Sequence, residues 1–128
     1  MKKIHESAEN YLETILMIGN RQAHVRSIDI ATELEFSKPS VSVAMKNLRL
    51  NGHIEMDSDG FITLTESGRK IAETIYERHQ VLSMCLIRLG VDPKTAAEDA
   101  CRMEHVISPE SFDAIKQHVN TLPNKEGE

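Results

Sequence analysis

A cysteine, a glutamate and a histidine stand close together in the last third of the sequence. They are Cys101, Glu104 and His105, in the run Cys-Arg-Met-Glu-His. In a helix these positions are i, i+3 and i+4, so the three side chains would share one face. Thiolate, carboxylate and imidazole together suit a borderline divalent transition metal better than Ca²⁺ or Mg²⁺. The alternative is a buried cysteine beside a surface glutamate and histidine, and the short motif does not decide between them.

Further donors for a metal site would have to come from other segments of the chain. Asn10 and Glu13 are three residues apart beside one apolar stripe, and His79 falls within another. A histidine in an apolar row is more often a hydrogen-bonded core residue than a ligand. The spacing does not show whether these segments converge, so their part in a site stays open at this point.

A predicted helix over residues 38–50 carries side chains suited to DNA. Its amino-terminal end is small and hydroxyl-rich and its polar side is basic; the candidates are Ser37, Lys38, Pro39, Ser40, Ser42, Lys46 and Arg49. Small side chains let a helix approach base edges, hydroxyls bind bases or phosphates, and Lys46 and Arg49 suit phosphates. The alternative is a solvated helix whose serines only cap it. Asp57 and Asp59, at the tip of a predicted hairpin, would repel a phosphate backbone.

The predicted elements that position these residues are helices around one hairpin. Apolar spacing, caps and turn residues place helices at 4–19, at 28–35 with Ser27 as N-cap, and at 38–50; a hairpin of 53–57 and 61–65; and helices at 66–89, 93 to about 106, and 109 to about 119. Thr65, Asp92 and Ser108 are the expected N-caps of the last three helices. This order predicts a winged helix-turn-helix arrangement in a mostly α-helical chain. The alternative is a helical bundle with an incidental hairpin.

Composition limits the class of protein further. The chain has 128 residues and a net charge of −5; residues 1–75 carry 9 basic and 11 acidic side chains, and residues 76–128 carry 6 and 9. Neither half is basic, so DNA binding would rest on local pattern, and bound metal cations would offset the acidic balance. The sequence contains neither a membrane-length apolar run nor a secretory apolar region. Two cysteines cannot build a disulfide framework, so we expect a reduced, cytoplasmic chain.

The last three predicted helices carry more apolar residues than one small domain can bury. These residues are Val81, Met84, Leu86, Ile87, Leu89, Val91, Met103, Val106, Ile107, Phe112, Ile115 and Val119. An isologous interface between two copies of the chain would cover them. We therefore expect a homodimer.

Four segments resemble the diphtheria-toxin-repressor family of metal-dependent transcriptional repressors. They are ENYLETI near the start, FSKPSVSVAMKNLRLNGHI across the third predicted helix, ERHQVL around His79, and DACRMEHVIS from Asp99 to Ser108. The resemblance implies a winged helix-turn-helix DNA-binding domain over 1–72 and an α-helical dimerisation and metal-binding domain over 73–122, with a frayed tail over 123–128. We expect the short form of the family, which lacks the SH3-like domain of the iron-sensing branch.

The resemblance implies a ligand set that combines two branches of the family. Cys101, Glu104 and His105 match the primary site of the iron-sensing branch. His79 matches a ligand in both branches. Glu13 matches a carboxylate ligand of the manganese-sensing branch, which has a glutamate in place of Cys101.

Three positions depart from the family pattern. Asn10 stands where one branch has Met and the other Asp, although its amide oxygen could still coordinate. Ser83 and Ala97 replace the Glu and His of an ancillary site of the iron-sensing branch, so that site is not implied. Because the Cys101 thiolate is a soft donor, we expect Fe(II), with Mn(II) as the alternative and Co(II), Zn(II) or Ni(II) possible in vitro.

The resemblance implies a homodimeric repressor that binds double-stranded operator DNA when Fe(II) or Mn(II) is bound and controls genes of metal-ion homeostasis. The alternative is a winged-helix regulator that senses a small organic ligand, in which the Cys101, Glu104 and His105 cluster is structural. A third class is a metal-dependent enzyme. The sequence shows no evident nucleophile–base pair, and an enzyme would leave the helix-turn-helix without a purpose, so we expect no enzymatic activity.

Overall fold

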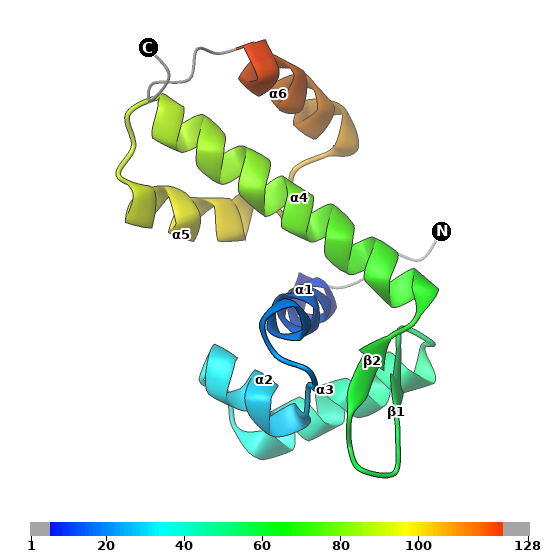
Figure 1. Ribbon diagram of the computed structural model, residues 1–128. Coiled ribbons are helices and arrows are strands. Elements are labelled where there is room, and N and C mark those ends of the chain that lie inside the picture. The colour runs from blue at the N-terminus through cyan, green and yellow to red at the C-terminus, as the bar shows by residue number, and fades with distance from the viewer. Residues whose placement is uncertain (1–5, 122–128) are drawn as a thin grey trace. The chain divides into compact units, whose positions relative to one another are not determined.

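The computed structural model describes residues 6–121, which form six helices and one hairpin (Figure 1). In chain order the elements are α1 (Glu6–Arg21), α2 (Ser27–Leu34), α3 (Lys38–Leu50), β1 (Ile54–Met56), β2 (Ile62–Leu64), α4 (Glu66–Arg88), α5 (Pro93–Met103) and α6 (Pro109–Thr121). The mostly helical fold with a small hairpin is therefore confirmed. The chain divides into two compact units, with the boundary between Thr74 and Ile75 inside α4. The expected helix start at Ile4 and the frayed tail lie outside the described residues.

The first unit is built on the contacts of α1 and α3 with their neighbours. α2 packs on α3, and α1 contacts α2, α3 and β2. Apolar side chains from all of these elements are buried, among them Leu12, Ile18, Ile30, Val41, Met45, Leu48, Ile54 and Ile62. The aliphatic stripes that predicted the helices are thus the residues that hold the unit together.

The bounds of α3 agree with the sequence prediction. The side chain of Ser37 caps the helix, because its Oγ accepts a hydrogen bond from the Ser40 N–H at 3.3 Å. Pro39 stands in the first turn, where its missing N–H would have had no helical partner. The helix ends with Asn51 as its C-cap, and Gly52 follows with a φ of +79°.

The hairpin is shorter than predicted and is closed by an aspartate. β1 and β2 pair in antiparallel register, with Ile54 opposite Leu64 and Met56 opposite Ile62. Asp57 Oδ1 accepts hydrogen bonds from the backbone N–H groups of Asp59 and Phe61, each at 2.9 Å. The carboxylate of Asp57 therefore holds the turn together.

The first turn of α4 lies against the chain that enters the hairpin. Thr65 Oγ1 accepts a hydrogen bond from the Gly68 N–H at 3.2 Å, which confirms the predicted N-cap. A Cβ atom on Gly68 would lie 1.9 Å from the backbone oxygen of His53. No side chain fits between the two backbones, so glycine is required here for close packing.

Two boundaries of the first helices differ from the predictions. α1 continues beyond Gly19, because Gly19 keeps a right-handed helical conformation and the Gln22 N–H still bonds to Ile18 O at 3.0 Å. Arg26, not Ser27, is the N-cap of α2. The Arg26 backbone N–H donates to Asp29 Oδ2 at 2.8 Å, so a carboxylate in the first turn of α2 satisfies this N–H group.

The end of α2 also differs from the prediction. The helix ends at Leu34, and Glu35 has a left-handed φ of 57°. The Phe36 N–H then returns to Ala31 O at 3.0 Å, which closes the last turn. A non-glycine residue in this conformation carries a small steric cost, so the tight turn into α3 overrides local preference here.

The second unit consists of the later part of α4 with α5 and α6, which lie on either side of α4 in Figure 1. Its buried residues are Ile75, Leu82, Ala96, Ala100, Phe112 and Val119. Arg88 Nη1 donates to Val119 O at 2.8 Å, and Lys116 pairs with Glu77 at 2.7 Å, so two polar contacts join α4 to the carboxy-terminal half of α6. Asp92 and Ser108 cap α5 and α6 as predicted. Within residues 6–121, no helix is long and apolar enough to cross a membrane.

Candidate metal centre and nucleic-acid interface

The end of α5 places the candidate ligands differently from a continuous helix. We predicted a helix to about Val106, but α5 ends at Met103. Glu104 is its C-cap residue, and the N–H groups of Val106 and Ile107 both bond to Met103 O at 3.1 Å. Glu104 and His105 therefore follow the last residue of α5, although the Glu104 N–H still bonds to Ala100 O at 2.9 Å and Glu104 keeps right-handed helical dihedral angles.

The carboxylate of Glu104 is the most deeply buried charged group in the described chain. It has 0% exposed surface. Its Oε1 lies 2.8 Å from His79 Nδ1, and its Oε2 lies 3.5 Å from His105 Nε2. Among residues 6–121, Oε2 has no hydrogen-bond partner. Its 3.5 Å contact with His105 would be an ion pair only with a protonated imidazole.

This arrangement fits a divalent transition metal. Burying a carboxylate is costly unless a cation or hydrogen-bond donors compensate its charge. Around Glu104 the compensation is incomplete, since one oxygen lacks a hydrogen bond. His79 and His105 supply imidazole nitrogens, which suit Fe, Co, Ni and Zn, and the carboxylate suits Mn as well. The donor chemistry therefore fits the metals expected from the sequence without choosing among them.

The remaining predicted ligands lie on α5 and α1. Cys101 is exposed on the last turns of α5. Glu13 is buried and Asn10 is half-buried, and both belong to α1 of the first unit. The backbone oxygen of Asn10 accepts a hydrogen bond from Thr14 Oγ1 at 2.8 Å.

The predicted DNA-contacting residues form one exposed surface of the first unit. Ser37, Lys38, Pro39, Ser40, Ser42, Lys46 and Arg49 are all exposed. The Ser37 hydroxyl also donates to Ser40 Oγ at 2.8 Å, so these two serines also stabilise the amino-terminal end of α3. Val43, which the sequence analysis did not single out, is 60% exposed on the same helix. An exposed apolar residue on a recognition helix is suited to a thymine methyl group.

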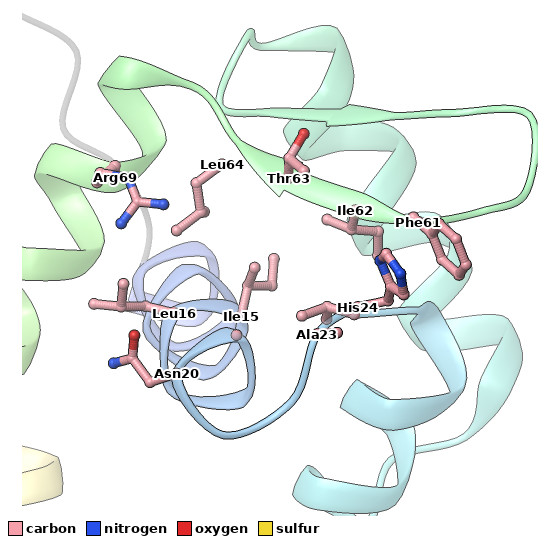
Figure 2. Close-up of a pocket in the computed structure, with 12 residues that line it drawn as sticks. Ile15, Leu16, Asn20, Ala23, His24, Phe61, Ile62, Thr63, Leu64 and Arg69 are labelled. Atoms are coloured by element: carbon pink, nitrogen blue, oxygen red, sulfur yellow. The ribbon is translucent and has the colours of Figure 1, made fainter.

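A cluster of His24, Arg26 and Phe61 beside the turn of the hairpin was also missed. The ring of His24 stacks on that of Phe61, with centroids 4.1 Å apart, and the guanidinium of Arg26 lies 4.6 Å from the Phe61 centroid. Figure 2 shows the His24 and Phe61 rings face to face. The cluster places the Arg26 guanidinium near the acidic hairpin tip. The basic residues just before the second helix were the available signal, but their pairing with Phe61 required the fold.

A pocket of about 210 Å³ lies between α1 and β2 in the first unit (Figure 2). Its wall is mixed in character: Ile15, Leu16 and Leu64 are apolar, and Asn20, Thr63 and Arg69 are polar. None of the predicted metal ligands lines it. The pocket and the candidate metal centre are therefore separate features.

The fold and the candidate site define a winged-helix protein with a buried carboxylate beside two imidazoles. Two family descriptions match the chain in order: "Iron dependent repressor, N-terminal DNA binding domain" over residues 3–60, and "Iron dependent repressor, metal binding and dimerisation domain" over residues 65–125. The chain belongs to this family of iron-dependent repressors. The family resemblance inferred from the sequence is thereby confirmed.

Curated relatives match most of the chain. The chain is 37% identical to the transcriptional regulator MntR of Escherichia coli O6:H1, over 87% of this chain and 72% of the relative. It is 31% identical to the diphtheria toxin repressor of Corynebacterium diphtheriae, over 86% of this chain and 49% of the relative. An HTH-type transcriptional regulator of Methanocaldococcus jannaschii is 32% identical, over 94% of this chain and 98% of the relative.

Solved structures support the same fold. The manganese regulator SloR matches with a TM-score of 0.79 and 25% identity, over 90% of this chain and 54% of that one. A manganese-dependent transcriptional repressor in complex with manganese matches with a TM-score of 0.82 and 24% identity, over 94% of this chain and 60% of that one. The chain thus spans little more than half the length of these two chains.

Proposed function

We propose that this protein is a homodimeric transcriptional repressor that binds operator DNA when a divalent transition metal occupies its second unit. The observation that carries the proposal is the Glu104 carboxylate, which is fully buried, 2.8 Å from His79, and left with one oxygen lacking a hydrogen bond among residues 6–121. The expected targets are genes of metal-ion homeostasis. Met84, Ile87, Leu89 and Val106, large apolar residues exposed on the second unit, support the dimer.

The proposed ligands are His79, Cys101, Glu104 and His105 of the second unit with Glu13 and Asn10 of α1. The bound cation would supply the positive charge that the clustered carboxylates need in order to be buried together. Because α1 contacts α2 and α3, holding α1 would also hold the helix that reads DNA. In a dimer, this sets the separation of the two α3 helices to match half-sites one or more helical turns apart.

We propose Fe(II) as the cellular metal, with Mn(II) as a weaker activator, because Cys101 adds a soft thiolate to an otherwise harder donor set. Cys101→Ser should weaken Fe²⁺ and Co²⁺ binding by about tenfold or more, and Cys101→Glu should shift the preference toward Mn²⁺. Anaerobic titrations with each metal, followed by operator binding, measure both effects. Unchanged activation of Cys101→Ser by Fe²⁺ and Co²⁺ would show that the thiol is not a ligand and would remove the iron assignment.

The proposed DNA interface is the exposed surface of α3, with Lys46 and Arg49 on phosphates. Lys46→Ala should weaken binding to all duplexes to a similar extent and lower the slope of log K against log salt by about one unit. Fluorescence anisotropy across a salt series measures this slope. Lys70→Ala, which removes an exposed lysine of α4, is the control. A slope that Lys46→Ala leaves unchanged means that α3 is docked differently.

The 210 Å³ pocket of the first unit is the one observation that favours a regulator of small organic ligands. Its volume is below the range of about 300–1,000 Å³ typical of small-molecule sites. The residues that line the pocket also include no buried carboxylate such as that of Glu104. Metal sensing therefore accounts for more of the chain's chemistry.

The function is tested by selecting duplexes from a random DNA pool with the full chain. With Fe²⁺ under anaerobic conditions, or with Mn²⁺, the selected sequences should converge on an inverted repeat, as the two-fold symmetry of a dimer requires. Selection in EDTA should give no enrichment. Equal enrichment with and without metal would support the regulator that does not sense metal, and no enrichment in either case would overturn the proposal.

A further inference from the structure

Arg78 precedes the candidate ligand His79 on α4 and holds the turn that carries the other ligands. Its Nη1 donates to Glu104 O at 3.2 Å and to Ile107 O at 3.0 Å. These carbonyls lie at the two ends of the four-residue turn between α5 and α6. One guanidinium therefore fixes both ends of the segment that contains Glu104 and His105.

One further contact, and the charge of the carbonyls already named, hold the guanidinium in place. Its carbon lies 5.5 Å from the centroid of the Phe112 ring of α6, within reach of a cation–π interaction. The carbonyls at the end of a helix lack helical partners and carry a partial negative charge, so an arginine at the end of α5 is electrostatically favourable. Arg78 is thus bound by α5, by the turn and by α6 at once.

The backbone of Glu104 and its carboxylate are held from neighbouring positions of α4. The Glu104 carbonyl bonds to Arg78, and the Glu104 carboxylate bonds to His79 at 2.8 Å. If the turn moved, the carboxylate would move relative to the imidazole, because Arg78 joins both ends of the turn to α4 next to His79. The position of one ligand relative to another therefore depends on a side chain that is not itself a donor to metal.

We propose that Arg78 is a positioning residue for the metal centre, fixing the Glu104–Ile107 turn so that Glu104 and His105 meet His79 in a geometry suited to a cation. The inference rests on the proposed function of this centre. Residues that orient metal ligands typically change affinity by about 10–100-fold when they are replaced. A lysine keeps the charge, but its compact ammonium does not reproduce the planar guanidinium that lies near the Phe112 ring while its Nη1 donates to both carbonyls.

Arg88 provides a matched control on the same helix. It is also a half-buried arginine whose Nη1 donates to a backbone carbonyl, that of Val119, at 2.8 Å. Its partner lies at the end of α6, not in the turn that carries the ligands. Arg78→Gln and Arg88→Gln therefore remove equal charge and similar packing, but only the first releases the turn.

The experiment titrates the full chain with Co²⁺ and follows its absorption spectrum, with thermal unfolding of the metal-free proteins recorded in parallel. Arg78→Gln should weaken Co²⁺ binding by about 10–100-fold and alter the ligand-field bands, which report coordination geometry. Arg88→Gln should keep the affinity and the bands of the wild type, even if it unfolds at a lower temperature. Arg78→Lys should fold, keep the charge and recover the affinity only in part.

The outcomes separate this inference from the proposed function. A wild-type chain that binds no Co²⁺ overturns the proposed function itself. A wild-type chain that binds Co²⁺ while Arg78→Gln has the same affinity and bands overturns the role of Arg78 alone, as does an equal loss in Arg88→Gln. If Arg78→Gln does not fold, the comparison is made with Arg78→Lys, and a wild-type affinity and spectrum for that variant overturn the role.

Discussion

Replacing Glu104 by glutamine should lower the affinity for Fe²⁺, Mn²⁺ and Co²⁺ by about a hundredfold or more, at or beyond the upper end of the effects of residues that only orient ligands. Glutamine keeps the size of the side chain and an oxygen that can still accept a hydrogen bond from His79. It removes the negative charge that a buried cation needs. Because Glu104 has 0% exposed surface, no water replaces the lost donor.

The same variant should be at least as stable as the wild type without metal. Its neutral amide replaces a buried carboxylate that lacks one hydrogen bond among residues 6–121. Metal titration and denaturant unfolding of the metal-free chain measure the two effects. Glu77→Gln is the control, since it removes the same charge from an exposed α4 residue paired with Lys116. Tight metal binding by Glu104→Gln would exclude the carboxylate as a ligand.

Replacing Gly68 by alanine should destabilise the chain by about 3 kcal/mol or more, at the upper end of the effects of overpacking. The added Cβ would lie 1.9 Å from His53 O and 2.9 Å from His53 C, and both are backbone atoms that cannot rotate away. Either α4 or the chain entering β1 must shift. The shift would also disturb the hydrogen bond between the Gly68 N–H and Thr65.

Urea unfolding of the metal-free chain measures this effect, and Gly19→Ala is the control. Gly19 lies inside α1, and a Cβ there would meet only Val25 Cγ2 at 3.9 Å. Alanine should therefore stabilise α1 by up to about 1 kcal/mol through its helix propensity. A Gly68→Ala variant as stable as the wild type would mean that α4 and β1 do not pack this closely.

Local signals predicted the elements whose ends are set by nearby residues. The bounds of α3 follow from the Ser37 cap, Pro39 and the Asn51–Gly52 stop, all within the segment itself. The α5 end could not be predicted in this way. The carbonyls of the turn after it accept hydrogen bonds from Arg78, which lies 26 residues away from Glu104 in sequence.

The candidate site was predicted in kind but not in geometry. Residue types and the family resemblance selected His79 and Glu104, whereas helical spacing placed Glu104 and Cys101 on one face. In the structure Glu104 is fully buried and Cys101 is exposed. Asp57 shows the same limit, because its charge suggested repulsion of DNA while its carboxylate closes the hairpin turn. Side-chain hydrogen bonds between distant segments decide these roles, and periodicity does not report them.

The most direct test of metal-activated DNA binding is a thermodynamic cycle on a duplex obtained by selection. Operator affinity is measured with saturating Fe²⁺ and in EDTA, and Fe²⁺ affinity is measured with and without the operator. We expect metal to raise operator affinity by a factor of about 5–150, and the operator to raise metal affinity by the same factor, since coupling between two sites is reciprocal. Equal operator affinity with Fe²⁺, with Mn²⁺ and in EDTA would contradict the account.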